Sequence, residues 1–166
     1  MYREEVIQKE FERWYRLATD VEIKHELEKL KEHHSQIDDA FYRQLEFGTG
    51  GLRGVLGAGT NRMNIYTVKR ASIGLANYVV KNGGTRIVIG YDTRINSKLF
   101  ADTAASVFSS LGIEAYIYTE PFPTPMLSYA VRDLCCDAGV MITASHNPSE
   151  YNGYKVYGSD GCQITA

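Results

Sequence analysis

The chain has 166 residues, which is the length of one good-sized domain or of one domain with an appendage. Hydrophobic residues make up 44% of it and charged residues 23%, which excludes a disordered chain and a coiled-coil rod. The net charge of −2 argues against a nucleic-acid partner held by bulk electrostatics, and no apolar run approaches the roughly 18 residues of a membrane span.

The first 46 residues differ in composition from the rest. They hold 20 of the 38 charged side chains and contain neither glycine nor proline. Two apolar stripes with helical spacing run through them, formed by Ile7, Phe11, Trp14 and Ala18 and by Ile23, Leu27 and Leu30. Asp38 or Asp39 could cap a third short helix that runs to Leu45. We therefore expect residues 1–46 to be a helical extension that packs on a core and carries no chemistry.

Residues 47–166 alternate between strand and helix patterns. Short β-branched or apolar runs predict buried strands over 86–91, 115–118, 138–143 and 154–157. Helices are predicted from a cap at Thr67 to Gly83, from Asn96 or Ser97 to Gly112, and from a cap at Thr124; the second buries Leu99, Ala104, Val107, Phe108 and Leu111. This order predicts an α/β fold, a three-layer α/β/α sandwich with a mainly parallel (mixed) sheet, preceded by the N-terminal helices.

The chemistry of such a sheet is expected in the loops that follow its strands, because ligands bind beyond the carboxyl ends of the strands. Ser145 follows a buried strand directly, and the turn at Asn147-Pro148 should hold its hydroxyl on a fixed, exposed loop with His146 beside it. An ordinary turn, in which Ser145 and Asn147 bond their own backbone, remains an alternative. A serine hydrolase is the weaker idea, since no GxSxG elbow is present.

Residues 47–59 contain six glycines but match neither the P-loop nor GxGxxG. Backbone N–H groups here, at Gly50 and Gly51, could approach an anion closely, and Arg53 could clamp a phosphate. The alternative is a flexible glycine loop with a surface arginine. His25, His33 and His34 lie on the charged helices, where we expect solvated side chains and no metal site.

The cysteines and the N-terminal residues indicate the compartment. Cys135 and Cys136 are adjacent and the total of three is odd, which fits disulfide pairing poorly and is typical of a reducing environment. The charged N-terminus lacks the apolar stretch of a secretory signal. We expect a cytoplasmic protein with no nucleic-acid and no membrane partner.

Four motifs together resemble the α-D-phosphohexomutase family, in that family's order. They are FGTGGLRG (47–54), GYDTR (90–94), TASHNP (143–148) and YNGYK (151–155). The helical leader and the GTGGLRG form are similar to the longer bacterial phosphoglucomutase branch, which includes phosphopentomutase-like relatives. The resemblance covers the whole chain but only about the first third of such an enzyme.

The resemblance implies that Ser145 is phosphorylated and exchanges its phosphoryl group with a sugar phosphate, between the 1- and the 6- (or 5-) oxygen. Glucose 1,6-bisphosphate would be the intermediate and activator. Mg²⁺ would be a cofactor, with the phosphate of Ser145 as one ligand. The implied roles are general acid/base for Lys155, charge neutralisation for Arg53 and Arg94, and loop or substrate contacts for His146 and Asn147.

The sequence departs from the family in what it lacks. The metal loop Asp-Gly-Asp-x-Asp and the sugar loop Gly-Glu-x-Ser-Gly do not occur in these 166 residues. We therefore expect a truncated first domain that is inactive alone, with the remaining domains of the enzyme as its partners. A non-catalytic phosphate- or protein-binding domain of the same fold is the alternative, as is a phosphomannomutase or phosphopentomutase.

Overall fold

The computed structural model describes residues 2–165, which form six helices and one six-stranded sheet. In chain order the elements are α1 (Tyr2–Leu17), α2 (Val21–Leu30), α3 (His34–Phe41), β1 (Phe47–Gly48), β2 (Gly51–Val55), α4 (Ile65–Lys81), β3 (Arg86–Tyr91), α5 (Ser97–Ser110), β4 (Glu114–Ile117), α6 (Thr124–Asp133), β5 (Ala138–Ile142) and β6 (Tyr151–Gly158). None of the helices in this range has the length and apolar character needed to cross a membrane.

The sheet has the order β1-β2-β6-β5-β3-β4 and changes direction in the middle. β4, β3 and β5 run parallel, whereas the pairs β5–β6, β6–β2 and β2–β1 are antiparallel. Helices connect the parallel strands, as the sequence predicts. β6 follows β5 after only the short segment 143–150, which cannot hold a crossover helix, so β6 returns antiparallel. The sheet is therefore mixed, with parallel pairing confined to β4, β3 and β5.

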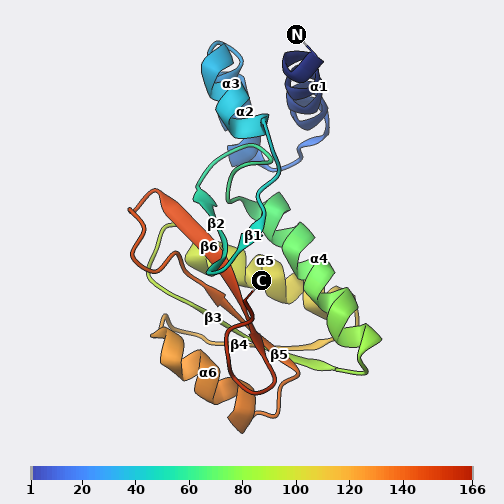
Figure 1. The fold of residues 1–166 in the computed structure, drawn as a ribbon, viewed down its shortest axis with the longest axis vertical. Coiled ribbons are helices and arrows are strands. Elements are labelled where there is room, and N and C mark those ends of the chain that lie inside the picture. The colour runs from blue at the N-terminus through green and yellow to red at the C-terminus, as the bar shows by residue number, and fades with distance from the viewer. Residues whose placement is uncertain (1, 166) are drawn as a thin grey trace.

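Helices cover both faces of the sheet (Figure 1). Ile87 and Ile89 of β3 pack with α4 and α5, in a cluster that includes Phe100 and Phe108. Val88, which alternates with them, packs on the other face with Leu127 and other residues of α6. Side chains of a strand point to alternate faces, so this burial confirms the predicted three-layer α/β/α sandwich.

Several predicted helix starts are wrong. Asn64 caps α4, and Thr67 is the partner residue of its capping box. Asp38 and Asp39 lie inside α3, because the helix already begins at His34 to bury Ile37. Thr124 is the first residue of α6, after Pro123 at the cap position. The helix ends at Gly83 and Gly112 are confirmed by their left-handed φ angles of 77° and 78°.

The predicted buried stripe of helix α5 is partly confirmed. Ala104 and Phe108 are buried as predicted, whereas Leu99 and Leu111 are 44% and 43% exposed. Phe100 and Ala101, which the sequence did not predict as buried, lie in the core in their place. The small alanines let α5 approach α4 and the sheet closely, which fixes the rotation of the helix about its axis.

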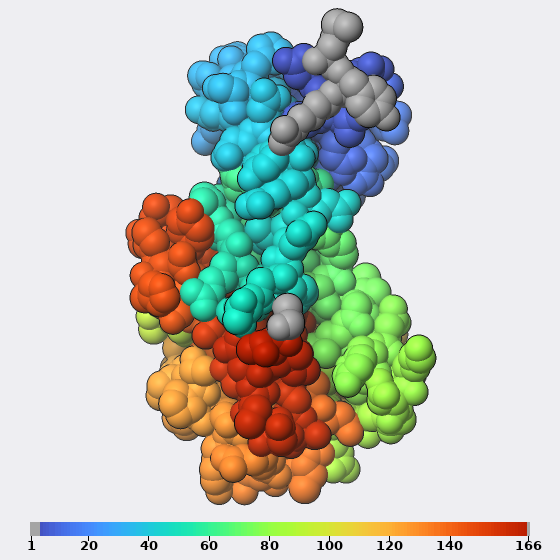
Figure 2. Space-filling view, in the orientation of Figure 1, coloured from blue at the N-terminus to red at the C-terminus, as the bar shows by residue number. Residues whose placement is uncertain are grey.

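The three N-terminal helices form their own lobe above the sheet (Figure 2). Their core is a separate cluster around Phe11, Leu27 and Phe41. The lobe is attached to the body at the start of α4, where the hydroxyl oxygen of Tyr66 accepts bonds from the backbone N–H groups of Thr19 (2.8 Å) and Asp20 (3.1 Å). The confirmed leader stripes are thus completed by two residues of the body, Ala58 and Tyr66.

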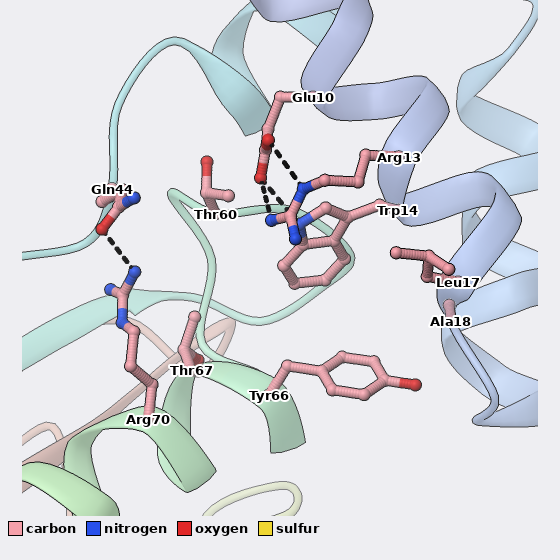
Figure 3. A pocket seen from close by; sticks show the side chains of 10 residues that line it. All are labelled: Glu10, Arg13, Trp14, Leu17, Ala18, Gln44, Thr60, Tyr66, Thr67 and Arg70. Atoms are coloured by element: carbon pink, nitrogen blue, oxygen red, sulfur yellow. Dashed lines mark hydrogen bonds and ion pairs between the residues drawn. The ribbon is translucent and has the colours of Figure 1, made fainter.

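A small pocket of about 240 Å³ lies at this junction (Figure 3). Trp14 stands edge-on to Tyr66, with ring centroids 5.3 Å apart. The charged side chains that line the pocket are already paired with protein groups: Arg13 donates to Glu10, and Arg70 donates to Gln44 at 2.6 Å. The pocket therefore joins the leader to the body and offers few free polar groups.

Replacing Tyr66 with Phe tests this attachment. The substitution keeps the ring and removes the acceptor of two backbone N–H groups, so we expect a loss of about 0.5–1.5 kcal/mol of unfolding free energy per lost bond. Denaturant unfolding measures it. Tyr78→Phe, on the exposed side of the same helix, is the matched control and should change little. Equal losses in the two variants would contradict the role of the Tyr66 hydroxyl.

Candidate active site

Ser145 lies where the central strand β5 ends, and its surroundings hold it outward. Thr143 and Ala144 are buried, whereas Ser145 is exposed. Its φ of 58° is left-handed, which a residue with a side chain seldom adopts unless its neighbours impose it. Its backbone N–H donates to the Thr143 hydroxyl at 3.0 Å, and the Asn147 N–H donates to the Ala144 carbonyl at 3.1 Å. Ser145 is thus exposed, as predicted, on a loop whose backbone is held by these bonds.

The side chains of Ser145 and Asn147 do not bond their own backbone, as they would in the alternative of an ordinary turn. The Asn147 side-chain oxygen accepts a bond from Arg53 on β2 at 3.0 Å. The Ser145 hydroxyl has one neighbour of interest, Nδ1 of His146 at 3.5 Å. That distance is too long for a bond that would activate the serine as in a hydrolase. Asn147 thus links the loop to the glycine-rich segment.

The glycine-rich segment is a β-hairpin, which corrects the expectation of a loop. β1 and β2 pair through Phe47 and Leu52, and β2 pairs with β6 so that Arg53 stands opposite Gly153. Figure 2 places this hairpin, in teal, beside the orange-red surface of the loop after β5. Arg53 therefore lies on a strand, and the pairing of that strand with β6 fixes the position of its backbone.

Gly50 and Gly51 make room for two cations. A Cβ on Gly50 would lie 2.6 Å from Nη2 of Arg53. On Gly51, whose φ is +94°, it would lie 2.7 Å from the Tyr154 carbonyl oxygen and 3.2 Å from Cγ of Lys155. The structure thus gives both glycines a packing role, and their predicted phosphate contact through backbone N–H groups stays a prediction.

Arg53 and Lys155 form a cationic pair with no anionic partner in the part of the chain that the structure describes. Arg53 is half-buried, and its Nε is a buried donor without an acceptor. Lys155 is also half-buried, and its ammonium group makes no ion pair there. Burial, followed by the positive charge of Arg53, lowers the pKa of Lys155 from its ordinary value of 10.5. Two unneutralised cations, one of which bonds to the loop that carries Ser145, favour an anionic ligand.

Arg94 differs from this pair, because protein groups occupy its guanidinium. Nη1 donates to the carbonyls of Pro148 (2.8 Å) and Tyr151 (3.1 Å), and Nη2 donates to those of Ser145 and Asn147 (both 2.7 Å). Its Nε lies 3.5 Å from a carboxylate oxygen of Asp92. The contact with a transferring phosphoryl group, predicted from the sequence, does not match this arrangement.

One polar network is not predicted from the sequence. The side chain of Asn152 is fully buried and donates to the Ile95 carbonyl at 2.9 Å and to the Ser97 hydroxyl at 3.0 Å. That hydroxyl in turn donates to Asp92 at 2.7 Å. The network fastens β6 to the loop after β3. Its signal in the sequence is an asparagine among the aromatic residues of the last motif, where an apolar strand residue would be expected.

The described residues contain no cluster of side chains that could hold a metal ion. Within residues 2–165 no three His, Cys, Asp or Glu side chains come together as a metal-binding group, and His25, His33 and His34 are exposed on the leader. The hollow of about 510 Å³ beside Ser145 contains one carboxylate, that of Asp92, which is engaged with Arg94 and Ser97. The described residues therefore do not fit a complete magnesium site.

Comparison with known proteins decides the family. Residues 44–166 match the family model described as phosphoglucomutase/phosphomannomutase, alpha/beta/alpha domain I. The chain belongs to this family. It is 48% identical over 128 residues to the phosphoglucomutase of Staphylococcus haemolyticus (76% of this chain and 23% of that one). It is 43% identical over 155 residues to the phosphoglucomutase of Staphylococcus aureus strain USA300 (93% and 28%).

Solved structures agree with the fold. A Thermus thermophilus protein assigned as a phosphomannomutase superimposes with a TM-score of 0.69 at 34% identity, over 74% of this chain and 27% of that one. A phosphoglucomutase/phosphomannomutase family protein of Burkholderia thailandensis gives a TM-score of 0.65 at 23% identity, over 75% and 28%. The chain thus spans about a quarter of the length of these relatives.

Gly51→Ala tests the packing beneath the cationic pair. The left-handed φ and the clash with the Tyr154 carbonyl should cost about 2 kcal/mol or more, measured by denaturant unfolding. Gly74→Ala is the control, because a Cβ there meets nothing within 4 Å on an exposed face of α4. It should stabilise the chain by about 0.5–1 kcal/mol. A neutral Gly51→Ala would mean that the hairpin adapts freely.

The lowered pKa of Lys155 predicts a pH-dependent stability. Below that pKa the folded state carries an unfavourable charge that the unfolded state tolerates, and the penalty disappears as the pH rises toward 10.5. Lys155→Met should therefore raise the free energy of unfolding at pH 7, and the gain should shrink between the lowered pKa and pH 10.5. Lys81→Met, at an exposed position, is the control. A gain that does not vary with pH would contradict the charge effect.

Proposed function

We propose that this chain is the phosphoserine domain of a sugar-phosphate mutase, in which Ser145 carries the phosphoryl group between two oxygens of the substrate. One observation carries the proposal: the loop after β5 exposes the serine hydroxyl and is bonded to Arg53. Arg53 and Lys155 are the two unneutralised cations. Membership of a family whose curated members are named phosphoglucomutase supports the same chemistry.

The reaction has two half-steps with opposite directions. In the first, a sugar hydroxyl oxygen forms a bond to the phosphorus of phosphoserine 145, and the bond from phosphorus to Ser145 Oγ breaks. The sugar is then a bisphosphate. In the second, its other phosphoryl group returns to Ser145 Oγ, which leaves the isomeric monophosphate. Phosphoryl transfer of this kind depends on positioning and on neutralised charge, and the cationic pair supplies the charge.

Lys155 is the proposed general acid/base. Its lowered pKa increases the neutral fraction, which can accept the proton of the attacking sugar hydroxyl at Nζ and pass it to Ser145 Oγ as that oxygen leaves. In the second half-step the proton moves in the reverse direction. An arginine side chain stays charged in proteins and cannot accept a proton, so the role of Arg53 is to hold phosphoryl oxygens and to lower the pKa of Lys155.

The proposed cofactor is Mg²⁺, which the family generally uses and which would offset the charge of the phosphoserine. The phosphate on Ser145 would contribute ligand oxygens, and the remaining ligands would come from outside the described residues. The proposed substrate is glucose phosphate with glucose 1,6-bisphosphate as intermediate, because the curated relatives above are phosphoglucomutases. Mannose phosphate is the second candidate substrate, because the Thermus thermophilus relative is assigned as a phosphomannomutase.

A chimera tests the function. The chain replaces the matching 155 residues of the Staphylococcus aureus phosphoglucomutase, and conversion of glucose 1-phosphate is followed with Mg²⁺ and glucose 1,6-bisphosphate. We expect turnover, with a mass gain of about 80 Da on Ser145, the mass of one phosphoryl group. Ser145→Ala should abolish most turnover, and Lys155→Ala should lower kcat by about 10²–10⁴. Cys162→Ser, an exposed thiol, is the control.

Three outcomes would contradict the proposal. They are a chimera that folds but leaves Ser145 unphosphorylated, turnover that survives Ser145→Ala, and an unchanged kcat for Lys155→Ala across the pH range. The chain alone should show no turnover in the same assay. Mannose 1-phosphate as the better substrate would change the assigned sugar and leave the mechanism intact.

A further inference from the structure

We propose that Arg94 is a positioning residue that fixes the conformation of the loop bearing Ser145, rather than a ligand of the phosphoryl group. The inference rests on the proposed function, in which Ser145 carries the phosphoryl group. Its evidence is the set of hydrogen bonds that the Arg94 guanidinium donates. Arg94 comes from the loop after β3 and reaches across to the segment between β5 and β6. There it binds the carbonyl oxygens of residues 145, 147, 148 and 151.

The bonds account for every donor of the side chain. Four N–H groups of the two Nη atoms go to the four carbonyls, and the fifth, on Nε, faces Asp92 at 3.5 Å. A phosphate on Ser145 could recruit Arg94 only by freeing carbonyls of an exposed loop. The carboxylate of Asp92 also neutralises Arg94, whereas Arg53 and Lys155 have no such partner among the described residues. The two unneutralised cations are the better phosphate ligands.

The bonds from the Arg94 guanidinium to the loop carbonyls, which we call the Arg94 clamp, act on the backbone of Ser145 itself. Its left-handed φ of 58° needs support from outside the residue. Arg94 holds the Ser145 carbonyl, and the Thr143 hydroxyl holds its N–H, so both peptide groups that flank Ser145 are fixed. Asp92 holds Arg94 in place in turn, because its carboxylate accepts bonds from the backbone N–H of Arg94 (3.0 Å) and from the Ser97 hydroxyl (2.7 Å). Arg94 thereby couples the serine to the start of α5.

The test compares Arg94→Ala, Arg94→Lys and Arg53→Ala in the 166-residue chain. One readout is hydrogen exchange of the Asn147 and Tyr151 N–H groups, which bond within the loop. The other is the Kd of inorganic phosphate, followed through the NMR shift of the Gly153 amide, which lies opposite Arg53. Arg62→Ala is the matched control, because Arg62 also donates to backbone carbonyls and a carboxylate, at the leader junction.

Both Arg94 variants should speed exchange of these amides by about ten-fold or more and change the phosphate Kd by less than about three-fold. A lysine retains the charge but has no planar fork to span four carbonyls, so it should not rescue the loop. Arg53→Ala should weaken phosphate binding by about ten-fold or more and leave the loop protected. Arg62→Ala should change neither readout.

The inference is overturned if Arg94→Lys keeps the loop protected, or if Arg94→Ala weakens phosphate binding as much as Arg53→Ala does. Absence of phosphate binding in the unmodified chain would instead count against the proposed function. The exchange measurement would still decide whether Arg94 is a clamp, so the two failures are distinguishable.

Discussion

The antiparallel pairing of β6 with both β5 and β2 is the constraint on which the site depends. It places Lys155 next to Gly51 and sets Arg53 opposite Gly153, so that two cations from distant parts of the chain share one patch. The pKa of Lys155 is lowered by its burial and by repulsion from the positive charge of Arg53. Bringing such a pair together is unfavourable for the free protein and becomes favourable when an anion binds between or beside them.

Arginine has two different uses at this edge of the sheet, and the sequence does not separate them. Arg53 is left with a buried, unpaired Nε, whereas Arg94 meets four carbonyls and a carboxylate. Both stand in motifs of the family, and the resemblance implies charge neutralisation for each. The distinction depends on the path of the loop after β5, because the carbonyls that saturate Arg94 come from residues more than fifty positions away.

Local patterns predicted most of the body, because each signal was short-range. The buried strands at 86–91 and 138–142, the glycine helix ends and the exposed Ser145 follow from residues next to them in the chain. The pairing of β6 with β2 joins strands that are distant in the sequence, so local patterns did not predict it. The hairpin at 47–55 is local, but its glycines suggested a loop instead. The prediction that Leu99 and Leu111 of α5 are buried was wrong, because large leucines outweighed small alanines in the apolar pattern, whereas close packing favours the alanines.

The most direct test of the cationic pair is the second ionisation of phosphoserine at position 145. The chain is prepared with phosphoserine there, and the ³¹P chemical shift is followed against pH. Free phosphoserine loses its second proton near pH 6, and nearby unpaired cations favour the dianion. The account predicts a pKa below about 6 that rises toward the free value in Arg53→Ala and Lys155→Met but not in Arg62→Ala. A pKa at or above the free value, unchanged in those two variants, would contradict it.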